Sequence, residues 1–325
     1  MKIIKPAKLK AGDRVGVVAP SQSINDRTDR FNKAVKVIED TLKLKLELAP
    51  HVLGEYYYSS GTVQERLNDF HQMVMDPTIK AIFFAVGGHT ANELIDQLDY
   101  DLIRQNPKII AGISDCTTLL NPIHAKTGLT TFHGLEFSSF GYPLERKYEI
   151  ASIKKTFFNG QIGEIKPNPN WQDVRGTPTR YSGWLQIKGG YASGQLVGGN
   201  ISSIFHFIDS PYSPNWQNKI LFLEGYKKSK KLIHSMLIDL KLRGVFDQIR
   251  GLILGYFVGS DDSDETTNSR SLKEILLETT NGYDFPIMQI GEIGHYVENA
   301  IIPIGATASI DADKLTFTIE EEIVI

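Results

Sequence analysis

A serine lies at the junction between a short apolar run and a helical pattern, in the sequence Gly112-Ile113-Ser114-Asp115-Cys116. The β-branched run before it predicts a buried strand, and the apolar spacing after it predicts a helix. A serine on such a turn, with small residues two positions away on either side, is typical of a nucleophile elbow. The helix that follows would stabilise negative charge at its N-terminus. The plainer interpretation, in which Ser114 or Asp115 only caps that helix, is equally compatible with this motif.

A serine nucleophile needs a base to take its proton and an acid to orient that base. His295 has the best position for the base, because it follows Gly294 in a loop after a predicted buried strand. Glu224 is the candidate acid, since a carboxylate that ends the apolar run 220–223 is costly to bury without a partner. A strand-end glutamate facing water is the alternative. The order serine, glutamate, histidine occurs in one known triad arrangement.

Other residues are candidates for binding rather than proton transfer. The backbone N–H groups of Gly88 and Asp115 are the candidate oxyanion donors. His89, in the same glycine-rich loop as Gly88, is placed to contact substrate. Asn200 either hydrogen-bonds substrate or shapes a turn. Trp171 or Trp184 either stacks on a flat substrate group or packs in the interior.

Strands and helices alternate through the first half of the chain. Strand patterns cover 13–19, 81–86 and 109–112, and helical patterns cover 27–42, 62–75 and 117–123. This rhythm predicts a parallel sheet with helices on both faces, with ligands bound beyond the carboxyl ends of its strands. The second half carries more strand, at 219–225, 251–256, 286–290 and 306–325. Five histidines are expected to be surface or packing residues: His51, His71, His124, His206 and His234.

The chain is long enough for two domains. We expect a nucleophile-bearing domain over 1–160, a linker and surface loop over 161–185, and a domain carrying acid and base over 186–325. The composition (41% hydrophobic, 22% charged, net charge −3) argues against a nucleic-acid or membrane surface. The single cysteine and the absence of a signal-like N-terminus favour the cytoplasm, and the single cysteine excludes a multi-cysteine zinc site.

Several short blocks, in order along nearly the whole chain, resemble the LD-carboxypeptidase family of serine peptidases, which includes the microcin C immunity proteins. They include Gly87-Gly88, Gly112-Ile113-Ser114-Asp115, Phe132-His133-Gly134, Gly198-Gly199-Asn200, Ile220-Leu221-Phe222-Leu223-Glu224 and Gly294-His295. The resemblance implies a triad of Ser114, Glu224 and His295. It also implies an N-terminal Rossmann-like domain, a β-rich mixed α/β C-terminal domain, a homodimer, and neither cofactor nor metal.

The segment 137–141 and the Trp171 region look more like the microcin immunity branch, which cleaves an amide in a peptidyl- or aminoacyl-nucleotide. The other branch releases D-alanine from murein tetrapeptides. The loop after Gly255 matches neither branch, so the resemblance leaves both substrates open. A small-ligand binding protein, with Gly87-Gly88 cradling an anion, is the alternative from another class. A dinucleotide-dependent dehydrogenase is disfavoured, because no strand leads into Gly-x-Gly-x-x-Gly.

Overall fold

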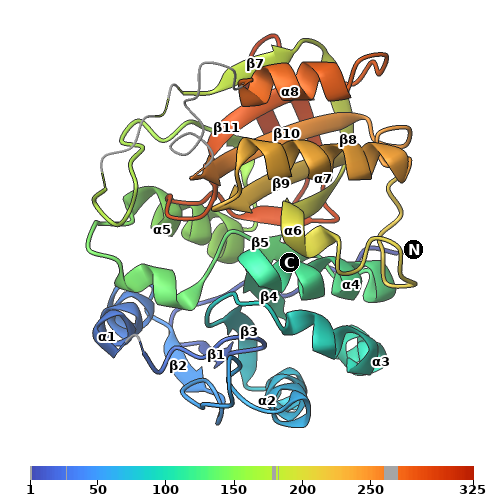
Figure 1. Ribbon diagram of the computed structural model, residues 1–325. Coiled ribbons are helices and arrows are strands. Elements are labelled where there is room, and N and C mark those ends of the chain that lie inside the picture. The colour runs from blue at the N-terminus through green and yellow to red at the C-terminus, as the bar shows by residue number, and fades with distance from the viewer. Residues whose placement is uncertain (1, 27, 178–180, 182, 260–269) are drawn as a thin grey trace.

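The computed structural model describes residues 2–26, 28–177, 181, 183–259 and 270–325. Two sheets form the molecule, one from each half of the chain, and helices lie on both (Figure 1). The predicted α/β class, with a mostly parallel first sheet and a β-rich second half, is confirmed.

The first sheet has the strand order β12-β5-β4-β3-β1-β2, and all of its pairs are parallel except β12 with β5. Its strands are β1 Arg14–Val18, β2 Lys45–Leu48, β3 Ile79–Phe84, β4 Ile109–Gly112, β5 Thr131–His133 and β12 Ile302–Ile304. Buried apolar side chains fill β3 and β4, as expected for strands covered on both faces.

The helices of the first half follow the predicted alternation. They are α1 Thr28–Lys36, α2 Val63–Met75, α3 Tyr100–Gln105, α4 Thr117–Thr127 and α5 Lys147–Ile153, with the 3₁₀ turns η2 Ala91–Gln97, η3 Ser114–Cys116 and η4 Phe137–Gly141 and the π-helical turns η1 Val37–Thr41 and η5 Lys154–Asn159. Thr62 caps α2 in a capping box with Glu65, as the spacing of the two residues predicts.

The second sheet has the order β6-β14-β13-β8-β9-β10-β11-β7, and its central strands β8 to β11 run parallel. The strands are β6 Gly163–Ile165, β7 Leu185–Lys188, β8 Tyr191–Asn200, β9 Lys219–Tyr226, β10 Gly251–Val258, β11 Ile287–Gly294, β13 Thr307–Asp311 and β14 Thr316–Ile319. Helices α6 Ile201–Ile204, α7 Lys230–Leu242 and α8 Leu272–Thr279 complete this half. None of the described helices is long and apolar enough to cross a membrane.

Two strands, β12 and β6, join sheets that their positions in the sequence did not predict. Strand β12 comes from the C-terminal half, yet it forms the edge of the first sheet beside β5. Strand β6 lies within 161–185, which we expected to be a linker and surface loop, and pairs with β14 in the second sheet. Neither segment carries a pattern that specifies its partner, because short apolar strands resemble each other.

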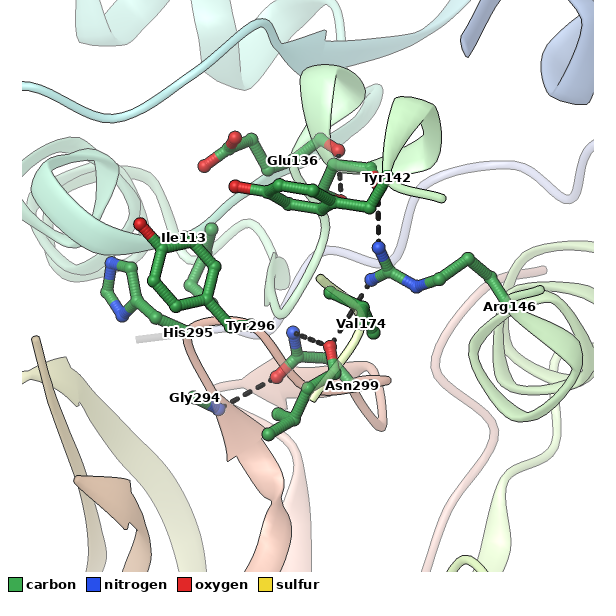
Figure 2. A pocket seen from close by; sticks show the side chains of 11 residues that line it. Ile113, Glu136, Tyr142, Arg146, Val174, Gly294, His295, Tyr296 and Asn299 are labelled. Atoms are coloured by element: carbon green, nitrogen blue, oxygen red, sulfur yellow. Dashed lines mark hydrogen bonds between the residues drawn. The ribbon is translucent and has the colours of Figure 1, made fainter. Parts of the chain in front are cut away.

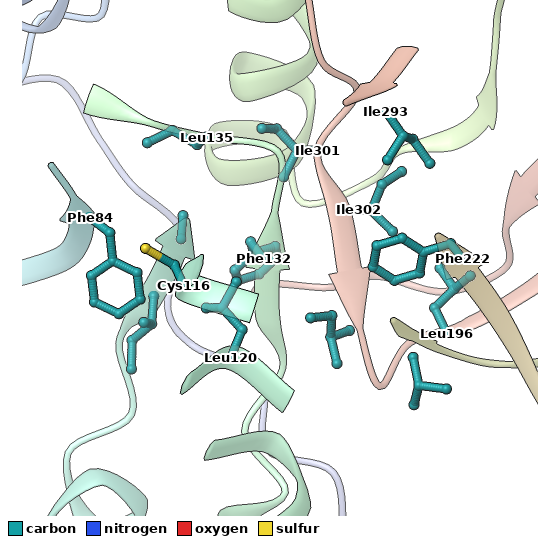
Figure 3. Close-up of a cluster of buried hydrophobic side chains, with 14 of the residues drawn as sticks. Phe84, Cys116, Leu120, Phe132, Leu135, Leu196, Phe222, Ile293, Ile301 and Ile302 are labelled. Atoms are coloured by element: carbon teal, nitrogen blue, oxygen red, sulfur yellow. The ribbon is translucent and has the colours of Figure 1, made fainter. Parts of the chain in front are cut away.

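One hydrophobic core joins the two halves. Buried side chains run without interruption from Phe84 of β3 and Leu120 of α4 to Phe222 of β9 and Ile293 of β11 (Figure 3). Packing of this density holds residues of both halves in a fixed relation. A site built from both sheets is therefore preorganised rather than assembled by domain closure.

Candidate active site

Ser114 occupies the turn that the sequence predicts, directly after β4 and at the start of η3. Its φ of 64° lies in the left-handed region, which is unfavourable for a residue with a side chain. Strain of this kind persists only where the surrounding structure enforces it, and it is common at functional sites. The side chain of Ser114 is partly exposed and lines a cleft of about 550 Å³.

Close packing around the turn explains the small residues that flank the serine. A Cβ atom built on Gly112 would lie 2.7 Å from the Cβ of Cys116 and 2.5 Å from the ring of Phe84. A Cβ atom on Gly87, in the next loop, would lie 2.8 Å from the Oγ of Ser114. All three distances are too short for real atoms, so only glycine fits at these two positions.

Neither Ser114 nor Asp115 caps the helix that follows. No side-chain cap is present on η3 or on α4. The carboxylate of Asp115 instead accepts hydrogen bonds from the N–H of Ala91 and the hydroxyl of Ser21, at 2.9 and 2.7 Å. The capping interpretation of the sequence is therefore wrong, and the hydroxyl of Ser114 is left to face the cleft.

Glu224 and His295 form a buried ion pair. The Nδ1 atom of His295 lies 2.7 Å from Oε2 of Glu224, and the side chains are 11% and 0% exposed. Glu224 is on β9, His295 follows the last residue of β11, and both positions lie at the carboxyl ends of parallel strands. The alternative of a strand-end glutamate facing water is excluded by this burial.

Each member of this pair shifts the pKa of the other toward the charged form. Burial lowers the pKa of His295, but the charge of Glu224 and its hydrogen bond outweigh burial and raise the pKa above the ordinary 6.5. Burial raises the pKa of Glu224, but His295 and the amide of Asn200 bring it below 4.5. The neighbouring His133 is fully buried, which lowers its pKa to about 4 and leaves it neutral at pH 7.

Asn200 connects the acid to the helix beside it. It is the last residue of β8, paired in register with Glu224, and its Nδ2 donates to Oε1 of Glu224 at 3.0 Å. Its Oδ1 accepts the N–H groups of Ser202 and Ser203, so it also caps α6. The turn role predicted from the sequence is present as the cap of α6, the bond to Glu224 was not predicted, and contact with substrate stays a prediction.

The loop after β11 is held in place by the first half of the chain (Figure 2). The Oδ1 of Asn299 accepts the N–H of Gly294 at 2.8 Å, which closes the loop on itself around His295. The N–H of Asn299 donates to Glu149, and Arg146, paired with Glu149, donates to the carbonyl of Val297. Helix α5, from the first half of the chain, thereby fixes the position of His295 in the second half.

The predicted oxyanion donors lie on the same cleft. Gly88 and Asp115 both line it, on the two sides of Ser114. Among the described residues, the backbone N–H groups of Gly88 and Asp115 have no protein acceptor. Two free N–H groups beside a strained serine can stabilise an oxyanion.

Several residues of the cleft were not predicted from the sequence. His206, expected to be a surface or packing residue, lines the cleft, with its Nδ1 3.9 Å from Asp115. Tyr226 lies with its ring 4.8 Å from that of His295, and its hydroxyl is 2.8 Å from that of Tyr296. Charged groups complete the lining: Arg30, Glu136, Arg175 and Lys228. Except for Arg30, which lies in α1, their common signal is a position within a few residues of a strand's carboxyl end or in an irregular loop.

Of the other predicted binding residues, two line the cleft and two are not among its lining residues. His89 and Asn200 line the cleft. Trp171 belongs to a small hydrophobic cluster that also contains the lining residues Tyr226 and Tyr296. Its indole packs against Tyr256 and donates to the carbonyl of Gly291 at 2.8 Å. Trp184 donates to Glu292 at 2.6 Å and is 8% exposed. Trp184 is therefore a packing residue, whereas Trp171 is half-buried and its stacking on a substrate group stays a prediction. Within the described ranges, no cluster of His, Cys, Asp and Glu side chains is arranged to hold a metal ion.

Known proteins share this architecture along its whole length. Residues 15–134 match the LD-carboxypeptidase N-terminal domain, and residues 193–310 match the C-terminal domain of that family. A Bacillus subtilis protein named "Probable murein peptide carboxypeptidase" is 31% identical, covering 97% of this chain and 94% of its own. The microcin C7 self-immunity protein MccF of Escherichia coli is 30% identical, covering 97% and 95%.

A solved structure of MccF in complex with aspartyl sulfamoyl adenosine superimposes with a TM-score of 0.91 at 30% identity, covering 99% of this chain and 100% of that one. The sequence resemblance, the two-sheet fold and the serine elbow thus agree. This chain belongs to the LD-carboxypeptidase family and is a serine peptidase-like hydrolase.

Proposed function

We propose that this protein hydrolyses an amide bond in a peptidyl- or aminoacyl-nucleotide through Ser114, Glu224 and His295. In this mechanism His295 takes the proton of Ser114 while the serine oxygen attacks the amide carbonyl. The C–N bond then breaks, the amine leaves with the proton from His295, and water activated by His295 hydrolyses the acyl-enzyme and frees Ser114. Glu224 orients the imidazole and stabilises its charged form. The N–H groups of Gly88 and Asp115 receive the oxyanion.

The observation that carries this proposal is the buried Glu224–His295 pair on a cleft that Ser114 also lines. A buried ion pair costs free energy, so its presence at a cleft is better explained by chemistry than by stability. The raised pKa of His295 makes it a stronger base for the serine proton.

The lining of the cleft supports a nucleotide-like substrate. Three tyrosine rings, Tyr142, Tyr226 and Tyr296, offer flat apolar surfaces, and Arg30, Arg175 and Lys228 offer positive charge. Arg175 is held by Asp173 and lies 3.6 Å from the centre of the Tyr296 ring. Solved relatives bind adenosine monophosphate and aminoacyl sulfamoyl nucleosides.

Cleavage of murein tetrapeptides is the second candidate, favoured by relatives named for murein carboxypeptidase activity. The two substrates are best compared with the same enzyme preparation. We expect the Ser114→Ala variant to lose turnover by several orders of magnitude on whichever substrate the wild type cleaves. The matched control is Ser23→Ala, another buried loop serine, which contacts Val52 rather than the cleft.

A fluorophosphonate probe separates the enzyme from a binding protein. In the proposed reaction the Oγ of Ser114 forms a bond to phosphorus, fluoride leaves, and the proton passes to His295. Labelling of the wild type at Ser114 and not of the Ser114→Ala variant is the expected result. An unlabelled wild type, or unchanged turnover in the variant, rules out the mechanism.

The homodimer implied by the family and the cytoplasmic location favoured by the composition are part of the proposal. Size-exclusion chromatography with light scattering measures the first. Cell fractionation with an antibody against the chain measures the second.

A further inference from the structure

The turn that carries Gly88 is held by a serine from a distant part of the chain. Ser21 lies three residues after β1 and is fully buried. Its Oγ accepts the N–H groups of His89 and Thr90, both at 2.9 Å. Its own hydroxyl hydrogen goes to Oδ2 of Asp115, at 2.7 Å. Every hydrogen-bonding capacity of this hydroxyl is thus used on the two elements that would form the oxyanion hole.

The same carboxylate oxygen fixes the far end of the turn. Oδ2 of Asp115 also accepts the N–H of Ala91 at 2.9 Å. Asp115 is 2% exposed, so both of its hydrogen bonds are charge-assisted and shielded from water. The residue whose backbone N–H is one oxyanion donor therefore anchors, through its side chain, the turn that carries the other donor.

Steric contact adds to these hydrogen bonds. Gly88 has a φ of 150°, and a Cβ atom there would lie 2.2 Å from the Oγ of Ser21. A Cβ atom on Gly87 would lie 2.7 Å from the Cβ of Ser114. The turn therefore passes so close to the two serines that neither Gly87 nor Gly88 can carry a side chain without a shift.

We propose that Ser21 is a positioning residue that sets the N–H of Gly88 for the oxyanion by holding the turn 87–91 against Asp115. The inference rests on the proposed serine-hydrolase function. It goes beyond that function because Ser21 touches neither the nucleophile nor the base through any contact described above. Its effect would be transmitted through the backbone of the turn.

The test is the saturation kinetics of labelling by a fluorophosphonate, which needs no knowledge of the natural substrate. Loss of one oxyanion donor typically lowers a rate about 100- to 1,000-fold, and Ser21→Ala displaces a donor rather than removing it. We therefore expect the maximal labelling rate to fall about 10- to 100-fold. The half-saturating probe concentration should change less than the maximal rate, because the oxyanion donors act on the charge that develops during the reaction. The pH midpoint should not change, because the substitution leaves the Glu224–His295 pair unaltered.

Two further variants make the result decisive. Ser23→Ala, the matched buried serine, should label at the wild-type rate. Asp115→Asn retains the backbone N–H but weakens the anchor, and should reproduce the loss seen in Ser21→Ala. Because both act on the same turn, the double variant should lose less than the product of the two single losses.

The outcomes separate the two hypotheses. A wild type that is not labelled at Ser114 overturns the proposed function. A wild type that is labelled, together with a folded Ser21→Ala variant that labels as fast as Ser23→Ala, overturns the role of Ser21 alone. If Ser21→Ala does not fold, the Asp115→Asn variant decides. If that variant is labelled at the wild-type rate, the role of Ser21 is overturned.

Discussion

The two halves of the molecule place chemistry at the carboxyl ends of parallel strands, but they do so by different physical means. After β4, close packing against the glycine positions 87 and 112 holds the turn of Ser114 in a strained backbone conformation. After β9 and β11, Glu224 and His295 are held by charge and hydrogen bonds in a buried setting. The nucleophile therefore depends on shape, and the proton relay depends on electrostatics.

This difference predicts which substitutions each half tolerates. Changes of charge at constant shape should damage the C-terminal half, and changes of shape at constant charge should damage the N-terminal half. Five experiments test that division, beginning with the largest expected effect.

Glu224→Gln keeps the shape and removes the charge. Removal of an orienting acid in a triad costs about 10,000-fold in turnover, and we expect a loss of about 1,000- to 10,000-fold here. Steady-state kinetics measure it. The control is Glu292→Gln, a buried glutamate of β11 bonded to Trp184, which should keep turnover within tenfold. Equal losses in the two variants would contradict an electrostatic role specific to Glu224.

Gly87→Ala changes shape without changing charge. Its new methyl group would overlap Ser114, 2.7 Å from the Cβ atom, so the turn must move. We expect about a 100-fold loss of labelling at Ser114, and about 1–3 kcal/mol lower stability from overpacking. Gly61→Ala, whose nearest neighbour is the side chain of Glu65, is the control and should label normally.

The pH dependence of the rate reports on the buried pair. The base must be neutral, so the rate should rise with pH through a midpoint above 6.5, the ordinary pKa that Glu224 raises. In Glu224→Gln only the charge of Glu136 still opposes the effect of burial on the pKa of His295, so the midpoint should move down. If the midpoint is the same in both proteins, the group that titrates in the rate profile is not His295.

The same pair contributes to stability within a limited pH range. For His295, whose pKa is raised, the contribution is complete below 6.5 and is lost as pH rises through the folded-state pKa. For Glu224, whose pKa is lowered, it is complete above 4.5 and is lost as pH falls through the folded-state pKa. Chemical denaturation across this range, in wild type and Glu224→Gln, measures the difference.

The smallest effect concerns the strain at Ser114. A side chain in the left-handed region costs about 1–2 kcal/mol, and glycine avoids this cost. Glycine, however, loses more backbone entropy on folding than alanine does, which cancels part of the gain. Ser114→Gly should therefore be about 0.5–1 kcal/mol more stable than Ser114→Ala, although both are inactive. At the exposed helical position Ser235 the order should reverse, with glycine about 1 kcal/mol less stable than alanine. The same order at both positions would argue against strain.

The predictions from sequence succeeded where a local pattern has one physical meaning. The run before Ser114 specifies a buried strand, and small residues around it specify a tight turn. Glu224 was identifiable because a carboxylate in an apolar run needs a partner. Asn200 meets Glu224 because β8 and β9 are neighbours in the sheet and these two residues are in register. The sequence does not give the order of the strands, so it could not predict this contact.

The predictions failed where the partner is distant in sequence and the segment is short or irregular. His206 lies in turns after α6, where no periodicity shows which side faces the cleft. For Trp171 the sequence left two roles open, because composition alone does not reveal that its loop folds back on β10 and β11 of the second sheet. Ser21 has no local signal either, since its role depends on a turn 66 or more residues away in the sequence.

Strand β12 has a consequence for how the molecule can be divided. A fragment that stops before residue 186 would expose the backbone of β5, because the strand that pairs with it would be missing. An open edge of that kind invites association with other chains. The two halves are therefore one cooperative unit in unfolding, and we expect neither half, expressed alone, to yield a stable monomer.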